Sequence, residues 1–232
     1  MAVAETSPRQ DPVIRRHHPI GVSTGFMADS RGNWPRQVDL AWDLSPFAVE
    51  LSALSEAELQ PLLDYLSALP RLPFRYLSVH GPSKGLQGDE VDLVKHLSLL
   101  APLCDGVVMH PDTMRDVSAY RELGRTLIVE NMDSRKSTGQ LPDQLGPVFE
   151  ELPEAGFCFD IAHAWSVDQD MEVAHALLDS LGSRLRHVHL SSLSEDLHHI
   201  SLTEEDEELF APVLKRCVDV PWILEAPPRT AP

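Results

Sequence analysis

Cysteine is scarce in this sequence, with only Cys104, Cys158 and Cys217 among 232 residues. An odd number of cysteines argues against a disulfide framework, and none lies in a CxxC pair of the kind that forms thiolate zinc sites. We therefore expect reduced thiols, which suits a cytoplasmic protein.

Long hydrophobic runs are also lacking. No stretch of about 18 apolar residues is present, as a membrane-spanning helix would need, and no charged segment followed by an apolar core marks a signal peptide. We expect a soluble cytoplasmic protein with no membrane partner.

Positive charge is outnumbered by negative charge. The sequence has 19 Lys and Arg residues against 36 Asp and Glu residues, which gives a formal net charge of −17. A surface of that sign repels a phosphate backbone unless a local basic patch overrides it. We therefore expect no nucleic-acid partner, and bound cations would offset part of the acidic excess.

The sequence does contain a regular alternation of short apolar runs and amphipathic stretches. Residues 1–18 have no helical or strand periodicity and are expected to form a flexible arm before a single domain over residues 19–232. The eight expected strands are Ile20 to Phe26, Phe47 to Leu51, Tyr76 to His80, Gly106 to His110, Thr126 to Glu130, Gly156 to Asp160, Leu185 to Leu190 and Pro221 to Glu225. The clearest helical patterns are Glu56 to Leu69, Val91 to Leu103, Met171 to Leu181 and Glu204 to Cys217.

This alternation predicts an α/β protein with a parallel sheet, and eight such units close into a (β/α)8 TIM barrel. The last expected strand lies so near Pro232 that the eighth helix must be short or missing. We expect the barrel bottom or its seam to be covered by the N-terminal arm or by a second subunit, which leaves a homodimer open.

Ionisable residues end seven of the expected strands. They are Glu50, His80, His110, Glu130, Asp160, His189 and Glu225. The carboxyl ends of barrel strands converge on one face, where the active sites of this fold lie. The sequence therefore predicts a common pocket of imidazoles and carboxylates.

Nearby residues extend this predicted pocket. Asp160 and His163 are three residues apart and can reach one ion, and His187 shares strand parity with His189 but is expected to be packed rather than a ligand. Asp196 and His198 follow in the next loop and would supply two further ligands.

Oxygen and imidazole donors suit hard or borderline divalent cations, so Zn, Mn, Fe, Co and Mg all remain open. A bound ion would polarise a carbonyl or lower the pKa of a coordinated water. Two carboxylates on opposite walls would move protons, and Glu130 and Glu225 are the natural acid and base.

These residues resemble those of the xylose-isomerase-like barrel superfamily, which joins sugar isomerases and epimerases to endonuclease IV-type apurinic-site endonucleases. The resemblance runs from Gly21 to Pro227. It implies that Glu130, Asp160, His189 and Glu225 form the isomerase metal site.

The endonuclease branch has further ligands, and this sequence resembles it there too. The resemblance adds His80, His110, His163, Asp196 and His198 as metal ligands and implies one to three ions, with zinc or manganese as candidates. The residues after His189 are Leu-Ser-Ser and lack the Asn-Asp that usually follows this histidine, and the loop that follows is short.

We therefore expect a metal-dependent isomerase or epimerase of a small sugar, polyol or sugar phosphate. Glu130 and Glu225 would be its catalytic residues, and Glu50, Lys84 and Arg135 would contact the substrate. The alternatives are a metallo-phosphodiesterase of the endonuclease IV type and a multinuclear non-haem iron oxidative enzyme.

Overall fold

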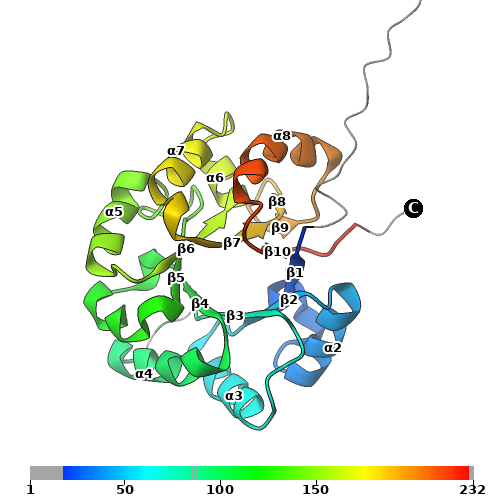
Figure 1. The fold of residues 1–232 in the computed structure, drawn as a ribbon, viewed down its shortest axis with the longest axis vertical. Coiled ribbons are helices and arrows are strands. Elements are labelled where there is room, and N and C mark those ends of the chain that lie inside the picture. The colour runs from blue at the N-terminus through cyan, green and yellow to red at the C-terminus, as the bar shows by residue number, and fades with distance from the viewer. Residues whose placement is uncertain (1–17, 85, 87, 230–232) are drawn as a thin grey trace, which may run out of the picture.

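A computed structural model describes residues 18–229 except residues 85 and 87. Within this part of the chain, parallel strands close into one eight-stranded barrel in the order β1-β10-β7-β6-β5-β4-β3-β2 (Figure 1). The barrel strands are β1 (Ile20–Ser23), β2 (Ala48–Ser52), β3 (Tyr76–His80), β4 (Gly106–Met109), β5 (Leu127–Glu130), β6 (Gly156–Asp160), β7 (Leu185–Leu190) and β10 (Trp222–Leu224). The predicted TIM barrel is confirmed.

Helices surround the barrel, as the ring of coiled ribbons in Figure 1 shows. The α-helices are α2 (Trp34–Leu44), α3 (Glu56–Ser67), α4 (Glu90–Leu100), α5 (Pro142–Glu151), α6 (Ile161–Val167), α7 (Glu172–Leu181) and α8 (Glu204–Leu214). The 3-10 helices are η1 (Thr24–Phe26), η2 (Ala28–Ser30), η3 (Ala101–Leu103), η4 (Pro111–Thr113), η5 (Val117–Thr126), η6 (Gly182–Arg184) and η7 (Lys215–Cys217). None of the helices in the described ranges is long and apolar enough to cross a membrane.

Local sequence accounts for where several helices begin. Capping boxes start α3 at Ser55, with Glu58 three residues on, and α8 at Thr203, with Asp206 three residues on. The connection from β4 to β5 is the 3-10 stretch η5 instead of an α-helix, and it is broken at Gly124, whose φ of 51° suits glycine.

The barrel has no eighth helix in the described residues, since β10 ends at Leu224 and no helix follows up to Arg229. The expected N-terminal arm lies outside the described residues apart from His18. The ring of that residue contacts the ring of Trp222 at the amino-terminal end of the barrel, with centroids 3.8 Å apart and an interplanar angle of 34°.

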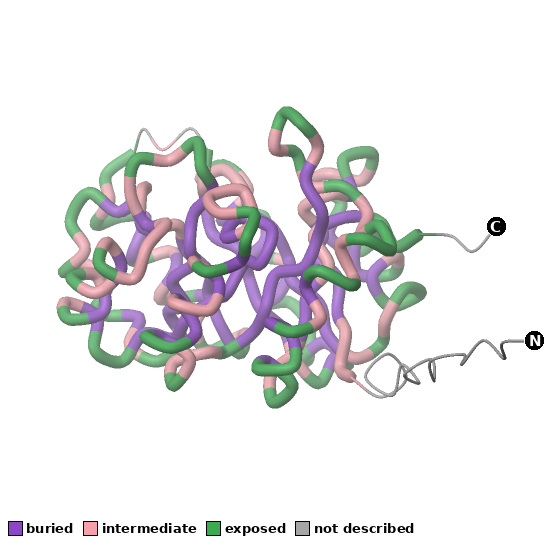
Figure 2. Tube along the Cα trace, turned by 90° about the horizontal axis from the view of Figure 1, so that it is seen from above, coloured by how far each residue is buried: buried purple, intermediate pink, exposed green. Residues whose placement is uncertain are grey.

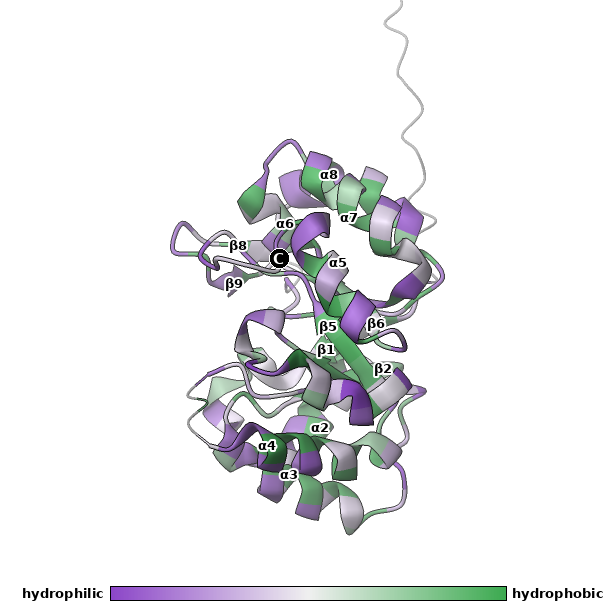
Figure 3. Cartoon of the chain, turned by 90° about the vertical axis from the view of Figure 1, so that its left-hand side faces the viewer, coloured by the Kyte–Doolittle hydropathy of each residue, from purple (hydrophilic) through white to green (hydrophobic). Residues whose placement is uncertain are grey.

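The apolar core lies mainly between the strands and the helices. Figure 2 shows the barrel strands as the buried centre of the molecule, and Figure 3 shows the largely apolar strand β5 between the helices. Inside the barrel, the buried hydrophobic cluster contains only Val108, Ile128 and Cys158. Alternate residues of a strand face the same side, which identifies the positions that face into the barrel. Most other inward positions among the described strands hold small or polar side chains.

A separate two-stranded antiparallel hairpin projects from the carboxyl end of the barrel. It consists of β8 (Ser192–Leu193) and β9 (His199–Ile200), which Figure 3 shows beside α6. The hairpin follows β7 directly, so it forms the loop after the seventh barrel strand.

Candidate metal centre

The ends of the barrel strands bring the expected ionisable residues together. Glu130, Asp160 and His189 are almost fully buried, and the side chains of His110 and Glu225 are each 13% exposed. Their ligand atoms form overlapping groups in which all atoms of a group lie within 4.8 Å of one another.

The first group joins β3, β4 and β5. Nε2 of His80 and Nε2 of His110 each lie 3.4 Å from Oε2 of Glu130. The other ring nitrogen of His80 donates to the backbone oxygen of Gly81 at 2.8 Å, so Nε2 is left with its lone pair. Nδ1 of His110 lies 4.0 Å from Asp112.

The second group consists of Glu130, Asp160, His189 and Glu225 from β5, β6, β7 and the end of β10. Nδ1 of His189 lies 3.5 Å from Oε2 of Glu130 and 3.4 Å from Oε1 of Glu225. Glu130 therefore belongs to both groups, through the same oxygen atom.

The third group consists of Asp160, His163 and His199. Nδ1 of His199 lies 2.7 Å from Oγ of Ser191 and 3.4 Å from Oε2 of Glu225. His199, on the hairpin, is a residue that sequence reasoning missed. Asp196 and His198, which were expected to be ligands, are exposed at the hairpin turn and belong to none of the groups formed by the described residues.

Several buried polar atoms at these groups have no hydrogen-bond partner. They are Oε2 of Glu130, Oδ2 of Asp160, Oε2 of Glu225, Nδ1 of His189 and Nδ1 of His110. Leaving such atoms unpaired costs about 1–3 kcal/mol each, so atoms clustered in this way indicate a ligand. Two ligands of one tetrahedral ion lie about 3.3 Å apart, close to the separations seen here. The donor atoms therefore fit divalent metal ions.

Burial and the surrounding charges shift the pKa values of Glu130 and Glu225 in opposite directions. Burial raises the pKa of Glu130, but His189 and His110 outweigh burial and hold it well below the usual value. Burial raises the pKa of Glu225 well above the usual value, because Asp160 and Glu130 add to it and His189 opposes it only in part. Of the two, Glu225 is therefore the carboxyl that is protonated more easily.

The pKa values of two buried histidines, His163 and His187, are also shifted in opposite directions. Burial lowers the pKa of His163, but Asp160 and Glu130 raise it to about 10. Burial and the neighbouring His189 lower the pKa of His187 to about 3. His187 accepts or donates a 2.7 Å hydrogen bond with Tyr76 inside the barrel, where it was expected to be packed.

A buried amide fixes the ends of β5 and β6 against each other. Asn131 donates from Nδ2 to the backbone oxygen of Asp160 at 2.9 Å, and its Oδ1 accepts from the Asp160 backbone nitrogen at 2.8 Å. Its own backbone oxygen accepts from Nδ1 of His163 at 2.9 Å. Asn131 thereby orients two residues of the third group.

The three residues expected to contact substrate lie in different surroundings. Glu50 is fully buried below the cluster, whereas Lys84 and Arg135 are exposed. Arg135 forms a fork with Asp133, with hydrogen bonds of 3.0 and 2.8 Å, and Lys136 lies 2.6 Å from Asp112. The charges of Arg135 and Lys136 are therefore balanced by Asp133 and Asp112 at the carboxyl end of the barrel, which we call the mouth.

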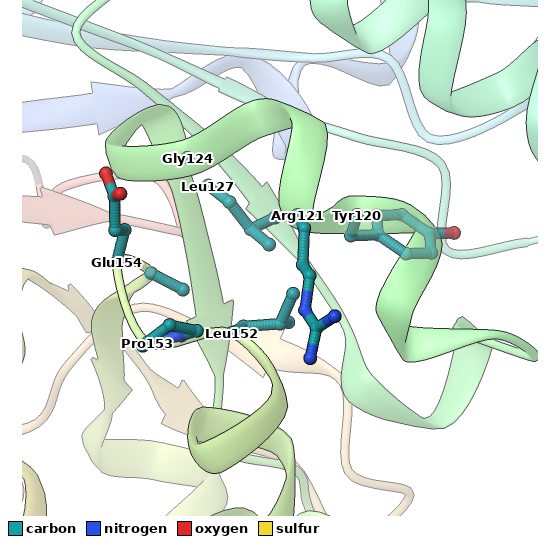
Figure 4. A pocket seen from close by; sticks show the side chains of 8 residues that line it. Tyr120, Arg121, Gly124, Leu127, Leu152, Pro153 and Glu154 are labelled. Atoms are coloured by element: carbon teal, nitrogen blue, oxygen red, sulfur yellow. The ribbon is translucent and has the colours of Figure 1, made fainter.

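A small cavity of about 150 Å³ lies elsewhere, at the start of β5 and β6. Figure 4 shows Tyr120, Arg121 and Leu127 on one side of it and Leu152 and Pro153 on the other. Because it opens at the amino-terminal end of the strands, it is separate from the ionisable cluster.

No family model matches the chain, and no curated protein matches it by sequence. Solved structures do match. A 3-keto-D-glucoside 4-epimerase from E. coli matches at a TM-score of 0.57 and 15% identity, covering 93% of this chain and 94% of the other. Endonuclease IV from Thermus thermophilus matches at 0.56 and 23%, covering 91% and 92%.

A D-psicose 3-epimerase from Clostridium cellulolyticum matches at a TM-score of 0.58 and 12% identity, covering 89% of this chain and 84% of the other. At these identities the likeness concerns the fold. The chain has the closed (β/α)8 barrel that these epimerases and endonuclease IV also have.

Proposed function

We propose that this chain is a divalent-metal-dependent enzyme in which two ligand groups that share Glu130 would each hold an ion, and that it hydrolyses a phosphoric ester of a small compound of the sugar class. The observation that carries the proposal is the position of Oε2 of Glu130, which lies 3.4, 3.4 and 3.5 Å from nitrogens of three imidazoles. One oxygen in contact with both groups is the arrangement of a bridging ligand.

Glu130 is poorly suited to act as a free base. Its Oε2 faces His80, His110 and His189, its Oε1 lies 3.2 Å from Nδ1 of His163, and the side chain is 1% exposed. No oxygen is left to take a proton from a substrate carbon. Glu225 is more exposed than Glu130 and is the carboxyl that would transfer protons at the mouth.

Charge favours an anionic substrate for a two-ion centre. Glu130, Asp160 and Glu225 bring three negative charges to the groups, and two divalent ions would bring four positive charges. A single ion would leave the same groups negative. Bound ions would supply Lewis acidity and an activated water. Phosphoric esters suit such a centre, because their hydrolysis needs both an attacking and a leaving oxygen to be stabilised.

The surroundings of the mouth favour a small substrate. Arg135 and Lys136, which lie near the strand ends, are already paired with Asp133 and Asp112. The formal net charge of −17 adds to this, because it repels an extended nucleic-acid backbone. The site therefore suits a compound held chiefly by the ions and the cluster itself.

The test is to strip the purified chain with a chelator and reload it with Zn, Mn, Mg, Co or Fe(II). Hydrolysis is then measured as phosphate release from a panel of sugar phosphates and as release of the alcohol from a panel of sugar phosphodiesters. We expect activity that returns with one of these ions at a stoichiometry of two or more. An abasic DNA duplex at low salt belongs in the panel. Nicking of this duplex would contradict the proposal that the substrate is a small compound. Absence of bound ions in the loaded chain would contradict the proposal as a whole.

A second candidate is isomerase or epimerase chemistry at the four-residue group alone. The observation that favours it is the raised pKa of Glu225, caused first by burial and then by Asp160 and Glu130, which makes this carboxyl a proton donor. Incubation with aldoses and ketoses in deuterated water tests it. Deuterium incorporation at carbon without phosphate release would favour this chemistry over hydrolysis.

A further inference from the structure

Glu50 is a carboxylate buried inside the barrel below the metal-ligand groups. Its side chain on β2 is fully buried, and it belongs to none of the ligand groups found among the described residues. A buried charge of this kind costs several kcal/mol unless it is paired. Its partners therefore indicate what it does.

Two neighbours fix the carboxylate of Glu50. Ser78, which pairs with Glu50 in the register of β2 and β3, donates its hydroxyl to Oε2 at 2.9 Å. On the far wall, Nε2 of His189 lies 3.1 Å from Oε1 and 3.2 Å from Oε2. Since a carboxylate only accepts, the proton of this second contact is on Nε2 of His189.

That proton decides which nitrogen of His189 faces the metal-ligand group. A neutral imidazole carries one N–H and one lone pair, so an N–H at Nε2 leaves the lone pair on Nδ1. Nδ1 is the atom that lies 3.5 Å from Glu130 and 3.4 Å from Glu225. With the proton on Nδ1 instead, the lone pair would be on Nε2 and would face Glu50, so no lone pair of His189 would face the metal-ligand group.

His80 achieves the same result through the backbone. Its Nδ1 donates to the backbone oxygen of Gly81, which leaves Nε2 for the ion. His189 has Glu50 in place of a carbonyl oxygen, and a carboxylate both fixes the tautomer and makes the imidazole a better electron donor.

His187 does not compete for Glu50. Its Nε2 lies 3.7 Å from Oε2 of Glu50, too far for a hydrogen bond, and its Nδ1 is 2.7 Å from the hydroxyl of Tyr76. The hydrogen bond of Glu50 across the barrel therefore goes to His189.

We propose that Glu50 is a positioning residue, which holds His189 as the Nε2–H tautomer and so sets the metal affinity of the group formed by Glu130, Asp160, His189 and Glu225. This role rests on the proposed function only in that the group binds an ion. It replaces the substrate contact expected for Glu50, since a fully buried side chain below the ligands does not reach a substrate.

The experiment compares Zn²⁺ binding by the full-length wild type, Glu50→Gln and Ser78→Ala, with metal content and competition titration as the readouts. Glu90→Gln is the matched control, because Glu90 is also a largely buried carboxylate, bonded to Arg115, Asp116 and Tyr120 away from the cluster. Two-dimensional NMR of ring-¹⁵N histidine in the zinc-loaded proteins reports which nitrogen of His189 carries the proton.

We expect Glu50→Gln to weaken one zinc site by about 10 to 100-fold, the usual effect of removing a partner of a ligating histidine, and Ser78→Ala to weaken it less. Glu90→Gln should match the wild type. Wild-type affinity and an unchanged Nε2–H signal in Glu50→Gln would overturn the role of Glu50. Absence of zinc from the wild type would instead contradict the proposed function. If Glu50→Gln does not fold, the Ser78→Ala variant decides the question. A wild-type zinc affinity of Ser78→Ala would then overturn the positioning role of Glu50.

Discussion

Nδ1 of His199 lies 3.4 Å from Oε2 of Glu225, so the hairpin after β7 meets the end of the last barrel strand. The neighbouring His198 is exposed at the hairpin turn. The hairpin therefore contributes His199, and not the adjacent His198, to the candidate metal centre.

We predict that His199→Ala lowers the zinc content of the loaded chain by up to one equivalent, because it removes a ligand from the group with Asp160 and His163. His198→Ala is the matched control, and it should keep the wild-type metal content. Elemental analysis after gel filtration measures both. The reverse result would return His198 to the ligand set expected from the sequence.

We predict that His110→Ala loses one equivalent of metal while the four-residue group keeps its ion, because His110 contacts only the first group. His96→Ala on the outer helix α4 serves as the control. Metal content should be compared with KM and kcat for any substrate found. Full metal retention with a raised KM would make His110 a substrate contact and favour a single-ion site.

Glu130→Gln and Glu225→Gln should have different effects on metal content. Glu130 is shared by two groups, so its substitution should release ions from both, whereas Glu225→Gln should affect only the four-residue group. Activity should fall at least about 100-fold in either variant, the loss seen when one electrostatic stabiliser is removed. Circular dichroism checks folding, and near wild-type turnover in either variant would remove that residue from the mechanism.

The stability of the metal-free chain should depend on pH through His187. Burial and then His189 lower its pKa from 6.5 to about 3. A histidine whose pKa is lowered by folding is more readily protonated in the unfolded chain, so its contribution is complete above pH 6.5 and is lost as the pH falls toward 3. The expected slope is about 1.4 kcal/mol per pH unit for one proton.

Urea unfolding of the chelator-treated chain between pH 4 and 6.5 measures this slope. His187→Gln should reduce it by about one proton. An equal slope in the wild type and His187→Gln would show that His187 is not the group that titrates. His163 acts in the opposite sense, because its pKa of about 10 gives stability that is lost as the pH rises from 6.5 to 10.

Much of the fold could be predicted from the sequence, because apolar runs and helical periodicity are local properties. All eight expected strands occur within a few residues of their predicted positions. The prediction of a short or missing eighth helix agrees with the described residues, in which no helix follows β10 up to Arg229. The η5 connection could not be predicted in the same way. The segment just before it is held by a contact distant in sequence, in which Glu90 accepts from the backbone nitrogens of Arg115 and Asp116.

The candidate site was predictable only in part. His80, Glu130, Asp160 and His189 lie at strand ends, where parity and barrel geometry bring them together. His199 was missed because the hairpin register decides which of two adjacent histidines turns inward, and sequence alone does not give that register. The depth of Glu50 was also missed, because the sequence marks a strand end but not the layer in which a side chain lies.

The polar interior of the barrel, with its small apolar cluster of Val108, Ile128 and Cys158, has a consequence for evolution and design. The packing that stabilises the fold lies between strands and helices, so inward-facing residues can be exchanged for new chemical groups with little loss of that packing. A combinatorial library restricted to inward positions outside the paired buried charges would therefore sample new reactions while keeping the packing between strands and helices.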